Sequence, residues 1–349
     1  MRLRIYSFAL ALPLLFLIPL LSLYETVHAQ TTGRNLRGHL HDTSGATLRW
    51  ILVHLFNSDG RPAGLTITDH EGAFSFQGLS QTSYTIIVAA ADHDPVNRQI
   101  SFAGQSNPNA TMVVEINLIA SHSGSVARPN FTQNIPPTAR AVYDRAIKIG
   151  QAGRRDVALT LMQEAVKIYP GYFDAHFALG NEFMKAGRLD EAISEFNMAL
   201  KINPNGDQAY QSLGLVLMRQ RKFTVAAALF AEAARLNPTE PLDPLLRAIV
   251  LLNYAYALTS SQSVGASAET NSAISEADTA LARADNLSHS QLAAIHLHRA
   301  RLYKLKGEKQ RAANELEQYL QQNPNDESAD SIRAEINRLR TPASESAPL

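Results

Sequence analysis

The chain has 349 residues, of which 45% are hydrophobic and 18% are charged, a balance typical of a folded protein with apolar material for two cores. Lysine plus arginine and aspartate plus glutamate each number 32, so the formal net charge is zero. We expect no nucleic-acid partner, because no broad basic surface is available. The sequence has no cysteine, which excludes disulfides, thiolate nucleophiles, iron–sulfur clusters and cysteine-ligated zinc.

Residues 1–29 have the layout of a secretory signal peptide. Arg2 and Arg4 precede an apolar stretch of 19 residues, 5–23, and residues 27–29 read Val-His-Ala, with small side chains at the first and third places. Cleavage after this triplet predicts an exported protein of the periplasm or cell envelope, or a secreted one. The apolar stretch is also long enough to stay as an N-terminal anchor, and in that alternative it attaches the protein to a membrane.

Residues 30–120 predict a small antiparallel β-sandwich. The hydrophobic pattern favours period two, as along 50–56, and this period is typical of strands. Asn-Ser-Asp-Gly at 57–60 and Asp-His-Glu-Gly at 69–72 supply the residues that tight turns require, so we expect both to close hairpins. About seven strands, a number typical of sandwiches, are expected at 36–41, 50–56, 64–68, 73–76, 84–90, 97–102 and 111–118.

Two adjoining stretches of this region resemble the carboxypeptidase regulatory-like family. Residues 69–79 fit the pattern D-x-x-G-x-F-x-F-x-G-L, and residues 84–88 fit Y-x-I-x-V. Ser83 stands where this family usually has glycine, and Asp-His-Asp-Pro at 92–95 replaces its usual Gly-aromatic pair. The resemblance implies a transthyretin-like sandwich that serves as an accessory module without catalytic residues.

A linker is expected over 121–138, and beyond it alanine, leucine and charged residues recur at helical spacing. Pro170, Pro204 and Pro238 lie 34 residues apart, and the residues between them superpose at the same interval, which indicates stacked helical hairpins in an α-solenoid. The residues at eight positions of this period resemble the tetratricopeptide repeat, namely positions 4, 7, 8, 11, 20, 24, 27 and 32. Counted from residue 173 they are His176, Leu179, Gly180, Phe183, Ala192, Phe196, Ala199 and Pro204. Counted from residue 207 they are Tyr210, Leu213, Gly214, Leu217, Ala226, Phe230, Ala233 and Pro238.

The small residues have a packing role in this prediction, because two helices approach closely only where side chains are small. We expect Gly180 to face Ala192 at the crossing of its hairpin. The array spans 139–340 and divides into 139–172, 173–206, 207–240, a degenerate unit 241–290, 293–326 and a capping helix 327–340, before a disordered tail 341–349. In the degenerate unit the second helix stands seventeen residues late, and we expect a loop insertion or an extended helix end over 259–271.

The resemblance implies that positions 2, 5, 9, 12 and 13 of a unit point into the concave face of the array, where tetratricopeptide families receive peptides. Polar amides, two cations and adaptable methionines on this face suit an extended peptide, although a merely solvated helix face is the other interpretation. The predicted peptide-binding residues are Asp174, Phe177, Asn181, Met184, Lys185, Gln208, Gln211, Leu215, Met218 and Arg219.

The carboxylate clamp of chaperone-cofactor repeats is not expected, since Asn181 alone matches it. Phe177, Ser212, Leu242 and Leu246 stand where its other residues would be. We therefore do not predict capture of a partner's C-terminal carboxylate.

No sequence pattern supports catalysis or a cofactor. His39 and His41 share one face of a strand, but no third ligand is defined, so we predict no metal site. The patterns H-E-x-x-H, G-x-S-x-G and G-x-G-x-x-G do not occur. The sequence therefore predicts an exported, non-catalytic scaffold that binds protein or peptide segments. The alternative is an accessory subunit of an envelope hydrolytic or polysaccharide-handling system, whose sandwich contacts carbohydrate through Trp50 or Tyr84.

Overall fold

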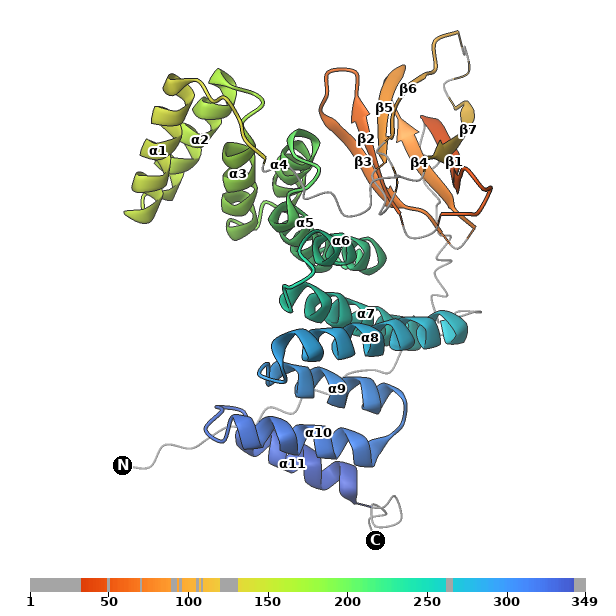
Figure 1. Cartoon of the computed structure of the whole chain (residues 1–349), viewed down its shortest axis with the longest axis vertical. Helices are drawn as coiled ribbons and strands as arrows, with labels where there is room; N and C mark the ends of the chain where they lie inside the picture. The colour runs from red at the N-terminus through yellow and green to blue at the C-terminus, as the bar shows by residue number, and fades with distance from the viewer. Residues whose placement is uncertain are drawn as a thin grey trace, which may run out of the picture.

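A computed structural model describes residues 33–48, 51–69, 71–88, 93, 96–104, 107, 109–119, 131–261 and 266–341. The predicted signal peptide, Trp50, most of the predicted linker and nearly all of the predicted tail lie outside these residues. Two sheets come first in the sequence and a stack of helices follows, so the predicted fold class is confirmed (Figure 1). None of the described helices is long and apolar enough to span a bilayer.

The sandwich consists of a three-stranded and a four-stranded sheet, ordered β4-β1-β7 and β3-β2-β5-β6. Its core lies between them and contains Leu36, Leu40, Ile86 and Leu118, all fully buried. Seven strands are described, at β1 (Arg34–Asp42), β2 (Leu52–Asn57), β3 (Pro62–Ile67), β4 (Ala73–Leu79), β5 (Ser83–Val88), β6 (Val96–Ser101) and β7 (Thr111–Leu118).

Two features of the sandwich differ from the sequence prediction. β1 and β7 pair in parallel, whereas the other described pairs are antiparallel. The turn at 57–60 joins the hairpin partners β2 and β3, but the turn at 69–72 leads from β3 in one sheet to β4 in the other, so it closes no hairpin. Its geometry is that of a tight turn, since Gly72 has a φ of +75°. A turn sequence fixes a reversal of direction, but strand pairing depends on side chains elsewhere.

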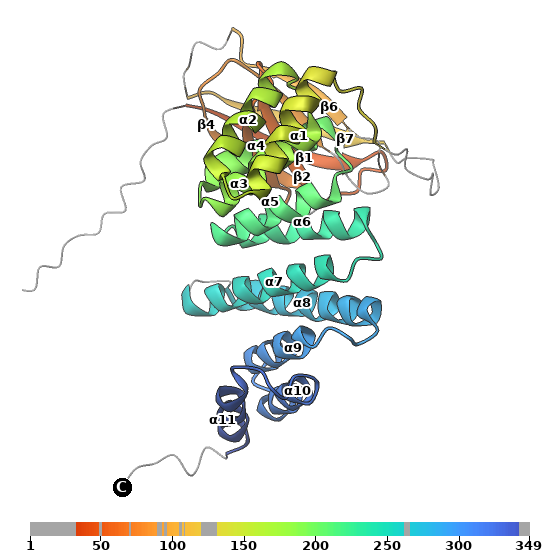
Figure 2. The same cartoon turned by 90° about the vertical axis from the view of Figure 1, so that its left-hand side faces the viewer.

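The helical half stacks in sequence order from α1 to α11 (Figure 2). Consecutive helices pack as hairpins, since α1 contacts α2, α3 contacts α4, α5 contacts α6, α7 contacts α8 and α9 contacts α10. The described helices are α1 (Pro137–Gln151), α2 (Arg155–Ile168), α3 (Phe173–Lys185), α4 (Leu189–Ile202), α5 (Asp207–Arg219), α6 (Phe223–Leu236), α7 (Leu242–Ser261), α8 (Ala266–Ser288), α9 (Ala294–Leu305), α10 (Lys309–Gln322) and α11 (Ala329–Arg340).

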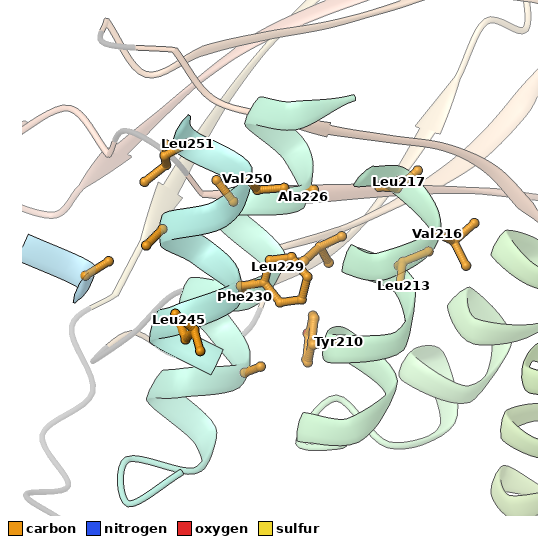
Figure 3. Packing of buried hydrophobic residues seen from close by; sticks show 14 of the residues in the cluster. Tyr210, Leu213, Val216, Leu217, Ala226, Leu229, Phe230, Leu245, Val250 and Leu251 are labelled. Carbon is orange, nitrogen blue, oxygen red and sulfur yellow. The ribbon is translucent and has the colours of Figure 1, made fainter. Parts of the chain in front are cut away.

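The glycine of each regular hairpin makes room for an aromatic ring. A Cβ on Gly180 would lie 2.6 Å from Phe196 Cε1, and one on Gly214 would lie 2.9 Å from Phe230 Cζ. Gly180 and Ala192 are both buried, and the atoms nearest to a Cβ on Gly180 belong to the Phe196 ring. Figure 3 shows how Phe230 of α6 packs among buried side chains of α5 and α7.

The degenerate unit contains two long helices. α7 has 20 residues and α8 has 23, whereas α5 and α6 have 13 and 14. Most of the inserted residues thus extend the two helices, which agrees with the extended helix end that we expected as one alternative over 259–271, and residues 262–265 between the helices lie outside the described residues. The composition of this stretch is aperiodic, but mutual packing of two helices stabilises segments that lack a clear amphipathic pattern.

The sandwich docks on the solenoid through β2 and β3, which contact α4 and α6 (Figure 1). Side chains of β2 alternate between two cores: Val53 and Leu55 lie inside the sandwich, whereas Leu52 belongs to the cluster of the helices. Residues 52–56 are buried without interruption because β2 lies between the two cores and both of its faces are covered.

Polar contacts complete the docking. Lys201 Nζ of α4 donates a 2.8 Å hydrogen bond to the Gly60 carbonyl and lies 5.0 Å from the ring centre of Phe56. His54 is 7% exposed, and burial lowers the pKa of its imidazole to about 4, with the neighbouring Asn197 side chain opposing this in part. The interface therefore holds a neutral histidine at pH 7.

Candidate peptide-binding face

The ten predicted peptide-binding residues lie on α3 and α5, the first helices of two successive hairpins. α3 and α5 contact each other, and Arg219 Nη1 of α5 donates a 3.2 Å hydrogen bond to the Met184 carbonyl of α3. Each of the ten is at least partly exposed. The structure thus brings the two predicted sets together on one surface, which we call the α3–α5 face.

Some polar side chains of this face already have partners within the protein. Gln211 Nε2 donates a 2.8 Å hydrogen bond to Asp243 Oδ1 of α7, and Lys185 Nζ lies 2.7 Å from Glu182 Oε1. Asp243 is 2% exposed, and its burial raises the pKa of its carboxyl to about 6. A ligand would have to compete for Gln211 and Lys185, whereas no partner is found for Asn181 and Gln208 in the part of the chain that the structure describes.

The apolar side chains of the α3–α5 face are half-buried. The Phe177 ring lies parallel to that of Phe173 at 6.1 Å and 5.9 Å from that of Phe196, so much of it belongs to the hairpin core. Met184, Leu215 and Met218 likewise pack on the core while part of each side chain stays exposed. These three present a flexible apolar surface of the kind that adapts to different side chains.

Two neighbours of this face were missed by sequence reasoning. Asp243 is one, because it stands at the third position of its unit, which is not among the positions expected on the concave face. The other is the end of the predicted linker, which is held against α3: the side chain of Gln133 accepts a 3.0 Å hydrogen bond from the Phe173 N–H and donates to the Gly171 carbonyl. The Phe131 ring lies 5.5 Å from that of Phe173. A lone glutamine in a linker carries no sequence signal for such a contact.

The other side chains that we considered for chemistry occupy the sandwich. His39 Nδ1 and His41 Nε2 each lie 3.3 Å from a carboxylate oxygen of Glu115 on β7. No set of three side chains suited to a metal ion occurs among the described residues. Tyr84 is 3% exposed and packs edge-on against Phe102, so it is not available to stack on a sugar.

Comparison with known proteins supports the identity of the helices. Tetratricopeptide repeat models match residues 151–214, 212–278 and 295–326. No curated protein matches this sequence. Among solved structures, MamA 41-end from Desulfovibrio magneticus RS-1 is similar, with 15% identity over 56% of this chain and 99% of that chain and a TM-score of 0.47.

Two further structures are similar at the same level. YrrB, described as a TPR protein with an unusual peptide-binding site, has 17% identity over 56% of this chain and 92% of that chain, with a TM-score of 0.46. PilF of Pseudomonas aeruginosa has 19% identity over 56% of this chain and 82% of that chain, with a TM-score of 0.44. The family models and the hairpin packing agree, and the helical half of this protein contains tetratricopeptide repeats.

Proposed function

We propose that this protein is an exported, non-catalytic scaffold that binds an extended protein segment on the α3–α5 face. The observation that carries the proposal is the side on which the sandwich docks: it contacts the second helices α4 and α6, while the ten residues on the first helices α3 and α5 keep part of their surface exposed. Tetratricopeptide domains generally bind protein partners, and models of this repeat match most of the helical half.

The chemistry of the α3–α5 face favours a ligand with apolar side chains and hydrogen-bonding backbone. Met184, Leu215 and Met218 offer adaptable apolar contact, and the amides of Asn181 and Gln208 can both donate and accept. Arg219 adds a cation, although an exposed charge contributes only about 0 to 1 kcal/mol. We therefore expect binding to depend on several weak contacts together, as for an extended peptide.

Export rests on the sequence of residues 1–29. Mass spectrometry of the mature protein from its native host tests this part: an N-terminus at Gln30 supports cleavage after Ala29. A protein that keeps these residues and is recovered from the membrane fraction indicates the anchor, and a cytoplasmic protein with Met1 contradicts export.

The binding face is tested by capture from envelope extract and by photo-crosslinking. In full-length protein we replace Asn181→Ala, Lys185→Glu and Arg219→Glu together, and expect loss of the captured partner because an amide contact is removed and two charges are reversed. A photo-reactive residue at Met218 should crosslink to the same partner.

The matched control is Lys167→Glu with Lys309→Glu, which reverses two exposed charges on the second helices α2 and α10. It should recover the partner as the unmodified protein does. Equal recovery with all three proteins, or a crosslink from position 167 in place of 218, would remove the α3–α5 face from consideration.

A further inference from the structure

A cavity of about 500 Å³ lies where the sandwich meets the solenoid, away from the α3–α5 face. One wall is the end of β3 and the turn after it, with Ile67 and Asp69. The others come from α6, α7 and α8. Sites for small molecules occur preferentially at domain interfaces, and their volumes start at about 300 Å³.

Part of the cavity wall comes from the inserted residues of the degenerate unit. Glu269, near the start of α8, lines the cavity and belongs to the length by which α8 exceeds its neighbours, and Tyr254 of α7 lines it as well. Figure 1 shows this end of the long hairpin running beneath the sandwich. A second helix of regular length would leave the cavity without Glu269.

The inner surface of the cavity is apolar. Ala227, Ala228 and Ala231 of α6 face it, together with Leu251 of α7 and Ala273 of α8. Small side chains on α6 keep the volume open, since a larger residue at any of these positions would project into it. An apolar body of a ligand would gain free energy here by leaving water.

The charged residues around the cavity are mainly acidic. Of the charged side chains that line it in the described part of the protein, three are carboxylates and one is a guanidinium. Arg247 Nη2 lies 2.8 Å from Glu276 Oε2, so these two neutralise each other. Asp69 and Glu269 form no ion pair among the described residues. Glu269 accepts a 3.0 Å hydrogen bond from the Tyr254 hydroxyl, which holds its carboxylate at the cavity. A net negative surface favours a positively charged ligand.

We propose that this interdomain cavity binds a compact organic cation that has an apolar body. The apolar part lies against the alanines of α6 and Leu251, and the ammonium group faces Glu269 and Asp69. The site is separate from the α3–α5 face, so its occupancy can be measured whether or not that face binds a peptide.

The test compares two small molecules of the same shape and opposite charge, 2-phenylethylamine and 3-phenylpropanoate, by calorimetric titration of the full-length protein at low ionic strength. We expect saturable binding of the amine in the millimolar range. Its affinity should exceed that of 3-phenylpropanoate about tenfold, because the carboxylates of Asp69 and Glu269 attract the amine and repel the negatively charged ligand. Absence of saturable binding of the amine, or equal affinity for both molecules, would overturn the proposal.

Two variants locate the binding. Ala231→Leu fills the cavity and should abolish binding of the amine, with circular dichroism to show that the helices persist. Glu269→Gln keeps an oxygen that can accept from the Tyr254 hydroxyl but removes the charge. It should lower the affinity for the amine by about two- to fivefold. Glu164→Gln, at an exposed position of α2, is the matched control and should bind as the unmodified protein does. Unchanged affinity in Glu269→Gln, or in a folded Ala231→Leu protein, assigns the amine to another site and contradicts the proposal.

Discussion

At the scale of single residues, the repeat is maintained by glycine at the point where the two helices of a hairpin meet. Gly180 and Gly214 are both in helical backbone with ordinary φ values, so they are needed for space and not for conformation. In each case the space is taken by a phenylalanine from the second helix, Phe196 or Phe230. The small and aromatic positions of the repeat therefore correspond to one contact, glycine of the first helix against phenylalanine of the second, which recurs in both hairpins.

This contact makes a graded prediction. Gly180→Ala gains about 1 kcal/mol of helix propensity but adds a methyl group 2.6 Å from the Phe196 ring, where overpacking costs about 1–3 kcal/mol. We expect a net loss of about 1 kcal/mol in the free energy of unfolding by urea, and a smaller loss for Gly214→Ala, whose nearest atom is 2.9 Å away. Phe196→Leu should reduce the cost of Gly180→Ala. A Gly180→Ala variant more stable than the unmodified protein contradicts this packing.

The buried His54 predicts a dependence of stability on pH. Burial lowers the pKa of this imidazole from 6.5 to about 4, so the unfolded state binds a proton at a pH where the folded state does not. The free energy of unfolding is therefore greatest above pH 6.5 and falls as the pH decreases towards 4. The loss is about 2 kcal/mol between pH 7 and pH 5 for this one group.

His54→Gln removes the titrating group and should reduce the difference in urea unfolding between pH 7 and pH 5 by that amount. His298 contributes in the same direction, since burial also lowers the pKa of its ring to about 4. A pH dependence that is the same with and without His54 would show that its imidazole is not buried in the folded protein.

At the scale of elements, β2 determines how the two halves are joined, because each of its faces belongs to a different core. The contact with α4 includes a lysine whose charge lies over an aromatic ring and against a carbonyl. Such a contact contributes about 1 kcal/mol when partly exposed.

Lys201→Met keeps the aliphatic part of the side chain and removes the charge, so we expect a loss of about 1 kcal/mol in stability. Hydrogen exchange should become faster in β2 and β3 and stay unchanged in α9 and α10. Lys167→Met, at an exposed position of α2, is the control and should change neither region. Uniform acceleration along the whole sequence would mean that Lys201 supports the fold generally and not the docking of the sandwich.

At the scale of the whole molecule, the sandwich and the solenoid form one assembly with two different surfaces. The sandwich contacts α4 and α6, and the α3–α5 face lies on the first helices of the same hairpins (Figure 1). The long α7–α8 hairpin reaches under the sandwich and encloses the cavity between them. This arrangement allows a partner on one side and a small ligand on the other, and the two binding experiments described above measure them independently.

The sequence by itself determined the local structure and the order of the parts. Strand-like residues along 50–56, turn residues at 57–60 and the 34-residue spacing of Pro170, Pro204 and Pro238 were sufficient for strands, helices and repeats, because each depends on neighbours within a few residues or on a fixed period. The resemblance to the tetratricopeptide repeat also implied which side chains of α3 and α5 share a surface.

Only the tertiary structure decided which distant residues meet. Nothing within residues 69–72 specifies that β3 and β4 enter different sheets, and nothing near Gly180 specifies that the ring of Phe196 lies closest to it. The docking of β2, the partner of Gln211 and the cavity beside Glu269 likewise arise from contacts between segments far apart in the sequence. Such contacts are chosen by the combined burial of many side chains, and no local pattern records that choice.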